Sequence, residues 1–334
     1  MQDNTRVILT KRPKDDATPD CFELITEPLK PLAEHQIRVA VDYVSVDAGT
    51  RTMLRGEGFH QQVALGGTIL AGGVGRVVQT NDPDWPVGTA VAGGLGVQQY
   101  ADVSPQHVQK LPDTNLPIQT YLGALGPSTG ITAWIGINQV AQPQPGEKFV
   151  VSAAAGAVGS IAGQLAKLAG AEVIGIAGGE RKCQYLTEQL HFDHAIDYKN
   201  ENLNQRLREL APDGINVFFD NVGGAVLDAV LDHIAMQGRV IICGAISQYN
   251  DMDAVTGPSM YLRLAERQAK MEGFAYFHFA DSIPTAAAAL SDLLADGKLT
   301  MPEEVMDGIE HYPEALQFMF SGGNLGKLMV KIGD

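Results

Sequence analysis

A turn of small residues is the first candidate for chemistry in this chain of 334 residues. Ala154, Gly156 and Gly159 follow the apolar run 149–151 and precede a helix-like segment, 160–168. A strand, such a turn and a helix N-terminus can hold the pyrophosphate of a dinucleotide, because glycine lets the backbone approach and the helix N–H groups meet the negative charge. Gly/Ala turns also join strands to helices that bind nothing, so the surrounding residues decide. The residues predicted to contact the cofactor here are Ala154, Gly156, Ala157 and Val158.

The tip of the following predicted strand indicates which dinucleotide binds. Gly178 and Gly179 stand there, with no carboxylate where NAD sites use one to bind the ribose. Arg181 and Lys182 come just beyond and suit the 2′-phosphate of NADP. The sequence therefore favours NADP. Two alternatives remain: Glu180 serves NAD, or the charged residues form a solvated helix start.

Zinc chemistry is not predicted. The three cysteines lie far apart, and the histidines of the first 120 residues have no ligand spacing with carboxylates. A metal-free hydride transfer needs another group to polarise the acceptor. A hydroxyl that donates to the carbonyl oxygen would stabilise the enolate formed when hydride enters at the β-carbon. Tyr249, in the loop 244–250 after the fifth predicted strand, is the candidate donor. The alternative is a tyrosine that only anchors its loop.

Two patterns along the chain must position these residues. Residues 1–120 hold short β-like runs without helices between them, which is typical of a small β-barrel-like domain. From 121 to 299 strands alternate with amphipathic segments, which predicts a doubly wound parallel sheet. In the tail, 300–334, a strand at 327–332 is expected to pair back into the first domain. The expected strands are 6–9, 22–25, 36–44, 72–78, 89–92, 149–151, 172–177, 195–198, 217–220, 239–243 and 271–277, and the expected helices are 160–168, 181–190, 202–210, 225–236 and 283–295.

Composition and charge narrow the function classes. The net charge is −15 and the sequence pI is about 4.9. We therefore expect no nucleic-acid partner and no anionic membrane, since both need a basic face. The sequence has no run of 18 apolar residues and no apolar signal core at its start. An odd number of scattered cysteines indicates reduced thiols, so a cytoplasmic enzyme is expected.

Several stretches together resemble one known family. They are A-A-A-G-A-V-G at 153–159, K-C at 182–183, F-D-N-V-G-G at 219–224, C-G-A-I-S-Q-Y-N at 243–250 and G-N-L-G-K at 323–327. Over nearly its whole length the sequence resembles a zinc-independent medium-chain dehydrogenase/reductase, of the branch that includes prostaglandin reductase (leukotriene dehydrogenase) and bacterial curcumin reductases. The resemblance implies a GroES-like domain over 1–120 and 300–334 and a Rossmann NADP-binding domain over 121–299.

The same resemblance implies an activity and an assembly. Members of this branch reduce the C=C bond of α,β-unsaturated ketones and aldehydes with NADPH, so the implied partner is a small-molecule enone. They are typically homodimers through the nucleotide domain. A quinone reductase with the same cofactor, or a cofactor-binding protein without turnover, are the alternatives. A zinc alcohol dehydrogenase is the least favoured.

The resemblance also assigns individual positions. Lys182 and Tyr198 match residues that hold the 2′-phosphate, and Tyr249 matches the tyrosine that bonds the substrate carbonyl. The further cofactor positions that it implies are Asn221 and Asn324 near the nicotinamide end, Cys243 in the matching stretch, and Phe274 in a strand close to the nicotinamide.

The chain departs from the family pattern in two places. The family's D-P-Y-M-R is D-A-G-T-R at 47–51, so a bulky pocket residue is lost. The family's M-P-G-x-T-A-Y is S-T-G-I-T-A-W at 128–134. Both changes leave cofactor use intact and leave the substrate open. The smaller group at 48–50 suggests a bulkier acceptor.

Overall fold

The computed structural model describes residues 2–56 and 60–333, which form two compact units. The first comprises Met1–Gly123, Glu303–Asn324 and Leu328–Asp334, and the second comprises Ala124–Pro302 with Leu325–Lys327. The domain boundaries predicted from the sequence, after 120 and before 300, stay a prediction.

The second unit is built on a parallel sheet of six strands. Its strand order is β10-β9-β8-β11-β12-β13, so the order reverses between β8 and β11. This is the doubly wound arrangement of a Rossmann domain, and ligands bind such sheets beyond the carboxyl ends of the strands at the reversal. The expected sheet of six strands is confirmed. Its strands are β8 (Lys148–Val151), β9 (Glu172–Ala177), β10 (His194–Asp197), β11 (Ile215–Asp220), β12 (Ile234–Ile242) and β13 (Lys270–Gly273).

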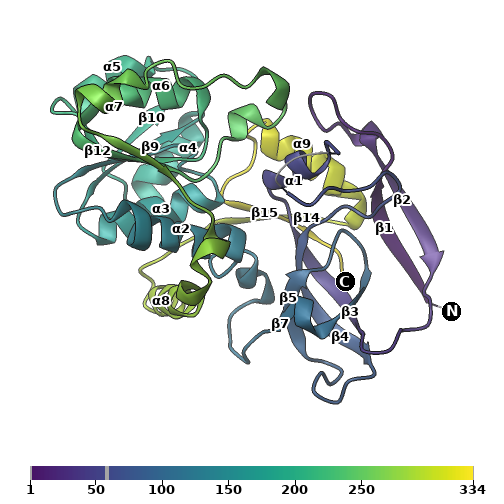
Figure 1. The fold of residues 1–334 in the computed structure, drawn as a ribbon. Coiled ribbons are helices and arrows are strands. Elements are labelled where there is room, and N and C mark those ends of the chain that lie inside the picture. Colours follow the sequence, from purple (N-terminus) through teal and green to yellow (C-terminus); the bar gives the residue numbers. More distant parts are fainter. Residues whose placement is uncertain (1, 57–59, 334) are drawn as a thin grey trace. The chain divides into compact units, whose positions relative to one another are not determined.

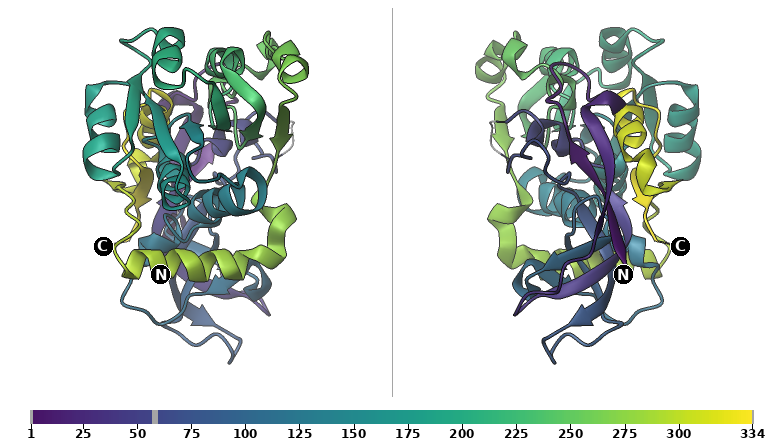
Figure 2. Two further views of the ribbon diagram at one scale, coloured as in Figure 1. Left: turned by 90° about the vertical axis from the view of Figure 1, so that its left-hand side faces the viewer. Right: turned by 90° about the vertical axis from the view of Figure 1, so that its right-hand side faces the viewer.

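Helices cover both faces of this sheet. Figure 1 shows α5, α6 and α7 on one side and α2 and α3 on the other, and the left view of Figure 2 shows the long yellow-green α8. The helices are α2 (Thr132–Ile135), α3 (Ala157–Leu168), α4 (Glu180–Gln184), α5 (Leu203–Leu210), α6 (Gly224–Asp232), α7 (Leu262–Glu266) and α8 (Ile283–Ala295), with π-helical turns at Pro127–Ile131, Gly136–Ala141 and Tyr185–Gln189.

Small residues allow the helices to lie close to the strands. A Cβ on Gly163 of α3 would lie 2.0 Å from the ring of the buried Phe192. On the opposite face, Val150 and Phe218 of the sheet pack with Leu207 of α5 and Val230 of α6. Burial of such side chains is the main stabilising contribution, at about 1.5–3 kcal/mol for each large apolar residue.

The first unit is a mainly antiparallel β domain. Its main sheet has the order β14-β15-β3-β4-β5-β7, with β6 paired to β3, and β1 and β2 form a separate hairpin. The hairpin is the purple ribbon in the right view of Figure 2. Met329 to Lys331 pair antiparallel with Tyr43 to Ser45, so the expected return of the tail strand is confirmed. The elements are β1 (Asp3–Leu9), β2 (Phe22–Pro28), β3 (Ile37–Ser45), α1 (Gly49–Met53), β4 (Gly72–Thr80), β5 (Ala90–Gly94), β6 (Tyr100–Val103), β7 (Val108–Lys110), β14 (Glu303–Asp307), α9 (Tyr312–Phe320) and β15 (Lys327–Lys331).

Two predicted elements are wrong at one end. The helix predicted over 225–236 ends at Asp232, because Ile234 pairs with Ile215 and starts β12. The strand predicted over 271–277 ends at Gly273, and a 3-10 helix follows at Tyr276–Ser282. Phe274 therefore lies just beyond β13 rather than within it.

Candidate functional site

The Gly/Ala turn leaves β8 at the carboxyl edge of the sheet. Ser152 N donates to Phe219 O at 3.1 Å, and Ala154 N donates to Ile176 O at 3.0 Å, so the turn lies between β9 and β11. A Cβ on Gly159 would lie 2.4 Å from the Ala153 carbonyl oxygen. Only glycine fits there, because real Cβ atoms do not approach so closely. Gly159 is thus required by the turn itself.

The turn opens directly into the N-terminus of α3. Gly156 has extended backbone angles and Ala157 is the first helical residue. The first N–H groups of a helix have no carbonyl partner within it, and the helix dipole adds partial positive charge. The N–H groups of Ala157 and Val158 are therefore open to an anion beside Ala154 and Gly156. A phosphate group fits this arrangement.

A segment from the tail lies against this turn. Gly326 N donates to Ala155 O at 2.8 Å, and Gly156 and Gly326 form a parallel bridge. Gly326 has φ +67° and a Cβ there would lie 2.0 Å from Pro302 O, so glycine is required. The G-N-L-G-K stretch is visible in the sequence, but its contact with the turn joins residues too far apart for local patterns to predict.

The acid nearest to the tip of β9 from the neighbouring strand, Asp197, is held by the loop backbone. Asp197, at the end of β10, accepts hydrogen bonds from Gly179 N at 2.8 Å and Lys199 N at 3.1 Å. These donors hold the pKa of Asp197 below its usual value, although burial acts in the opposite direction as the largest single effect. The carboxylate is thus committed to the loop backbone. A Cβ on Gly178 would lie 2.9 Å from Lys199 Cε and 3.0 Å from Tyr198 Cε1.

Lys199 is a candidate that sequence reasoning missed. Its stem lies against Gly178 beside the Tyr198 ring, and it is exposed. No ion pair with its ammonium occurs in the part of the chain that the structure describes. The signal was available, since Lys199 directly follows the predicted strand 195–198.

Lys182 and its neighbour occupy the first turn of α4. Lys182 N donates to Gly179 O at 3.1 Å. The backbone of Lys182, a residue predicted to hold the 2′-phosphate, is therefore bonded to the same loop that contains Gly178. Burial, followed by the charges of Asp197 and Glu201, raises the pKa of Cys183 to about 11. This thiol therefore stays protonated and has no nucleophilic role at neutral pH.

The loop after β12 docks on the loop after β11. Ile246 N donates to Asn221 O at 3.1 Å, and Ser247 N donates to Val222 O at 3.2 Å. Asn221 Nδ2 donates to Ser152 O at 2.8 Å, so Asn221 also reaches the start of the Gly/Ala turn. The structure therefore brings the predicted residues Asn221 and Tyr249 to the edge where the strand order reverses.

The Tyr249 hydroxyl is held by the backbone of its own loop. Its oxygen accepts a hydrogen bond from Ala245 N at 3.1 Å. An oxygen that accepts in this way still has its own hydrogen to donate. Burial is the largest effect on this phenol and raises its pKa above the usual value of 10.0, so it is protonated at neutral pH.

The remaining residues predicted to contact the cofactor are Cys243, Phe274 and Asn324. Burial, with the Asp220 charge, raises the pKa of Cys243 to about 12, and its N–H donates to Asp220 O at 2.9 Å. The Phe274 ring contacts Phe219 edge-on, with centroids 6.1 Å apart. Asn324 is buried in the first unit, directly before the segment Leu325–Lys327.

In the first unit, the departure at 47–51 leaves room beside Gly49. The nearest atoms to a Cβ there are His60 Cε1 and Nε2, both at 4.0 Å. Thr52 Oγ1 donates to Gly49 O at 2.7 Å and lies 2.6 Å from His60 Nδ1. Because the hydroxyl has one hydrogen and gives it to Gly49 O, His60 Nδ1 carries the hydrogen of the second bond.

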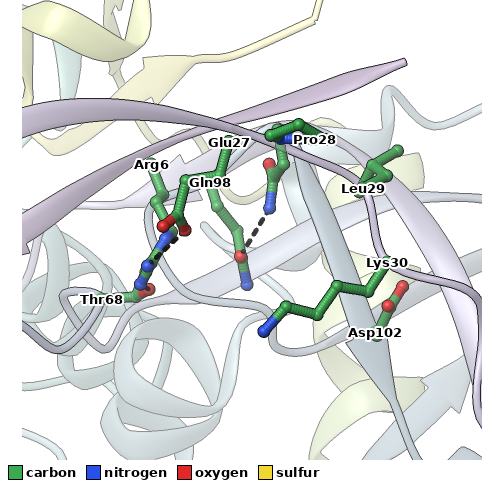
Figure 3. Close-up of a pocket in the computed structure, with 9 residues that line it drawn as sticks. Arg6, Glu27, Pro28, Leu29, Lys30, Thr68, Gln98 and Asp102 are labelled. Atoms are coloured by element: carbon green, nitrogen blue, oxygen red, sulfur yellow. Dashed lines mark hydrogen bonds and ion pairs between the residues drawn. The ribbon is translucent and has the colours of Figure 1, made fainter. Parts of the chain in front are cut away.

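A polar pocket in the first unit is not part of this site. Figure 3 shows the Arg6 guanidinium between Glu27 and Thr68. The Asn4 amide donates to Gln98 Oε1 at 3.2 Å. Arg6 pairs with Glu27 at 2.7 Å and with Thr68 at 3.1 Å. The polar groups mostly satisfy one another, and none of the predicted site residues lines the pocket.

The described residues contain no group of three or more His, Cys, Asp or Glu that could hold a metal ion. Among the same residues, no helix is long and apolar enough to cross a membrane.

Comparison with known proteins decides the family. Residues 157–292 match a family model described as zinc-binding dehydrogenase, and residues 5–111 match one described as N-terminal domain of oxidoreductase. A 2-alkenal reductase (NADP(+)-dependent) of Nicotiana tabacum is 38% identical over 87% of this chain and 85% of its own. The NADPH-dependent curcumin reductase of Escherichia coli is 32% identical over 99% of this chain and 97% of its own.

The chain belongs to the zinc-independent reductase branch of the medium-chain dehydrogenase/reductases. A solved structure, CurA in complex with NADPH from Vibrio vulnificus, matches it with a TM-score of 0.93 and 32% identity over 99% of both chains. The predicted fold class, a Rossmann sheet with a GroES-like β-barrel domain, is thereby confirmed. The name of the first family model refers to zinc, whereas absence of a metal from this chain stays a prediction.

Proposed function

We propose that this protein reduces the carbon–carbon double bond of α,β-unsaturated ketones and aldehydes, with Tyr249 as the hydrogen-bond donor to the carbonyl oxygen. The protein is an NADPH-dependent oxidoreductase of the enone and alkenal reductase kind. Its named relatives of this kind match it over most of its length. The observation that carries the Tyr249 assignment is its protonated hydroxyl, anchored by Ala245 N on the loop beside Asn221.

The residues of the second unit fit the cofactor. The N–H groups of Ala157 and Val158 suit the pyrophosphate, and the small residues Ala154 and Gly156 leave space for it. Asn221, Cys243, Phe274 and, from the tail, Asn324 are proposed to lie along the nicotinamide end. When bound, NADPH supplies the hydride that adds to the β-carbon.

Discrimination between NADPH and NADH is proposed to lie at the β9 tip. Lys182, Tyr198 and Lys199 would hold the 2′-phosphate through charge-assisted hydrogen bonds. Gly178 leaves room for the last two side chains. Asp197 is not available to bind the ribose hydroxyls, because its carboxylate accepts from the loop N–H groups.

Tyr249 acts on the charge that develops on the acceptor. As hydride enters at the β-carbon, the electron pair of the C=C bond forms a new double bond between the α-carbon and the carbonyl carbon. The electron pair of the C=O bond moves to the oxygen, which gives an enolate. A hydrogen bond from Tyr249 stabilises this oxygen, and removal of one such donor typically costs about 10²–10³-fold in rate. The enolate collapses when the α-carbon takes a proton from solvent or from a cofactor hydroxyl, so the product is the saturated carbonyl compound.

The space beside Gly49 supports an acceptor with a bulky substituent. A large side chain in the family pattern is absent there, and the closest atoms belong to His60. Gly49→Phe is therefore expected to lower kcat/KM more for an aryl-substituted enone than for a short aliphatic one. A loss of equal size for both acceptors would remove Gly49 from substrate selection.

We further propose a cytoplasmic homodimer. Strand β13 ends the sheet with an exposed edge, and the neighbouring Tyr261, Leu262 and Met271 are 64%, 60% and 39% exposed. Sheet edges and exposed apolar groups of this kind favour pairing with another chain. Three free cysteines suit a reducing compartment. Light scattering of the purified protein at the mass of one 35.7-kDa chain would reject the dimer.

The activity is tested by NADPH oxidation with matched panels of enones and quinones. Turnover of enones by the native protein, with a loss of about 10²-fold or more in Tyr249→Phe, is the expected result. Normal enone turnover by Tyr249→Phe would remove Tyr249 from the mechanism. Rapid turnover restricted to quinones would replace the proposed substrate class, and absence of turnover on both panels would favour a binding protein.

A further inference from the structure

A buried carboxylate that takes no direct part in the proposed reaction lies at the end of β11. Asp220 is 0% exposed. Its Oδ1 accepts hydrogen bonds from Ser152 Oγ at 2.8 Å and from Val222 N at 2.9 Å, and Gly223 N lies 3.1 Å from both carboxylate oxygens. A buried charge needs such donors, since without them its desolvation would cost several kcal/mol.

Ser152 joins this carboxylate to the end of β8. Its hydroxyl donates to Asp220 and accepts from Asn221 N at 2.8 Å, while its carbonyl accepts from Asn221 Nδ2 at 2.8 Å. The bonds therefore fix the turn 221–223 relative to the start of the Gly/Ala turn, at the point where the strand order reverses.

The turn 221–223 in turn fixes the loop that carries Tyr249. The Asp220 carbonyl accepts from Cys243 N at 2.9 Å and Gly244 N at 3.1 Å, and the Asn221 carbonyl accepts from Ile246 N at 3.1 Å. The last bond of the series runs from Ala245 N to the Tyr249 hydroxyl. Hydrogen bonds, joined by short stretches of backbone, thus connect the buried carboxylate with the loop that holds the proposed donor.

The carboxylate accepts hydrogen bonds from the Ser152 hydroxyl and from the N–H groups of Val222 and Gly223. Burial raises the pKa of Asp220, whereas the N–H groups of Val222 and Gly223 and the Ser152 hydroxyl lower it. An asparagine at 220 would keep the shape of the side chain. Its NH₂ group would either face the Gly223 N–H or remove the acceptor from Ser152, so the turn must shift.

We propose that Asp220 is a positioning residue, which holds the turn 221–223 and through it keeps the Tyr249 hydroxyl aimed at the substrate carbonyl. This inference rests on the proposed donor role of Tyr249. In this proposal Tyr249 touches the substrate, whereas Asp220 acts only through Tyr249. The value of kcat therefore depends on a carboxylate that is remote from the reacting atoms.

A double-mutant cycle tests the proposal. Asp220→Asn is expected to lower kcat about 10- to 100-fold, because displacement of a reacting group by about 1 Å costs on this order. In a Tyr249→Phe background the same substitution is expected to change kcat by less than about 2-fold, since the group it positions is gone. The Kd for NADPH should change by the same factor in both backgrounds, because any shift of Asn221 acts on the cofactor whether or not the Tyr249 hydroxyl is present.

The melting temperature provides the readout of a merely structural role. Any fall in melting temperature caused by Asp220→Asn should be the same in the native and Tyr249→Phe backgrounds. The effect on kcat should appear only in the native background. Asp228→Asn is the matched control, because Asp228 also accepts from a serine hydroxyl (Ser259, 2.9 Å) and a backbone N–H (Met260, 3.0 Å). This control should leave kcat unchanged.

Three results would overturn the proposal. One is an equal loss of kcat in both backgrounds, another is no loss in either, and a third is an equal loss in the Asp228 control. Should Asp220→Asn fail to fold, Ser152→Ala takes its place, with an expected loss of about 3- to 10-fold that again vanishes with Tyr249→Phe. Normal turnover by Tyr249→Phe alone would instead contradict the proposed function.

Discussion

Replacement of Gly178 by aspartate should reverse the discrimination between NADPH and NADH. The position has no positive φ, so the backbone accepts an L-residue. A Cβ there would lie 2.9 Å from Lys199 Cε and 3.0 Å from Tyr198 Cε1, and both contacts are with movable side-chain atoms. The substitution therefore displaces two proposed phosphate ligands and places a carboxylate at the strand tip, as NAD sites have.

The magnitude follows from two contributions. Loss of one hydrogen bond to a charged group costs about 1.5–3 kcal/mol. Repulsion between the new carboxylate and the 2′-phosphate adds about 1–3 kcal/mol at roughly 5 Å, if the effective dielectric constant is about 20–80. The two overlap, so we take about 3 kcal/mol, which weakens NADPH binding about 150-fold. NADH lacks the phosphate and should change by less than about 3-fold.

Titration of cofactor fluorescence measures both dissociation constants. Gly178→Ala is the control, because it displaces the same side chains without adding a charge, and it should weaken NADPH binding by a smaller factor. An equal loss for NADH and NADPH in Gly178→Asp would refute the reasoning, since the tip would then support the fold rather than select the cofactor.

Three further predictions concern cofactor selection, the pH dependence of kcat and the stability of the fold. Lys199→Gln should weaken NADPH binding about 10-fold and leave NADH unaffected. The control Lys298→Gln, which removes an exposed lysine paired with Asp296, should change neither; equal effects of the two variants would show a general charge effect. Because burial raises the pKa of Tyr249 above 10.0, kcat with an enone should show no decline caused by this group below pH 10, and an earlier decline that disappears in Tyr249→Phe would contradict a protonated donor. Gly163→Ala should lower the free energy of unfolding in urea by about 1–3 kcal/mol, because its Cβ would lie 2.0 Å from the ring of Phe192; unchanged stability would mean that the ring moves without cost.

The parallel sheet was accessible from sequence because its signals are local. The predicted strand 172–177 and helix 283–295 match the structure. The error at Ile234 has a physical cause, since Ile234-Ala235 suits a buried helix or a strand equally well. Only its pairing with Ile215 in the neighbouring strand decides between them.

The residues of the candidate site also differ in whether local sequence could indicate them. The Gly156 turn and the acid-free tip at Gly178 are single stretches, so their types and order indicate a cofactor. The role of Asp220 could not be read in advance, because its acceptor role depends on Ser152, which a different strand brings to it. Likewise, Asp197 has the appearance of a potential ribose ligand until its bond to Gly179 N is known.

Reduction of an enone with 4-deuterated NADPH tests the central claim most directly. Mass spectrometry and NMR of the product locate the transferred deuterium. The account predicts a saturated ketone or aldehyde with deuterium on the β-carbon and an intact carbonyl group. An allylic alcohol with deuterium on the former carbonyl carbon would contradict it.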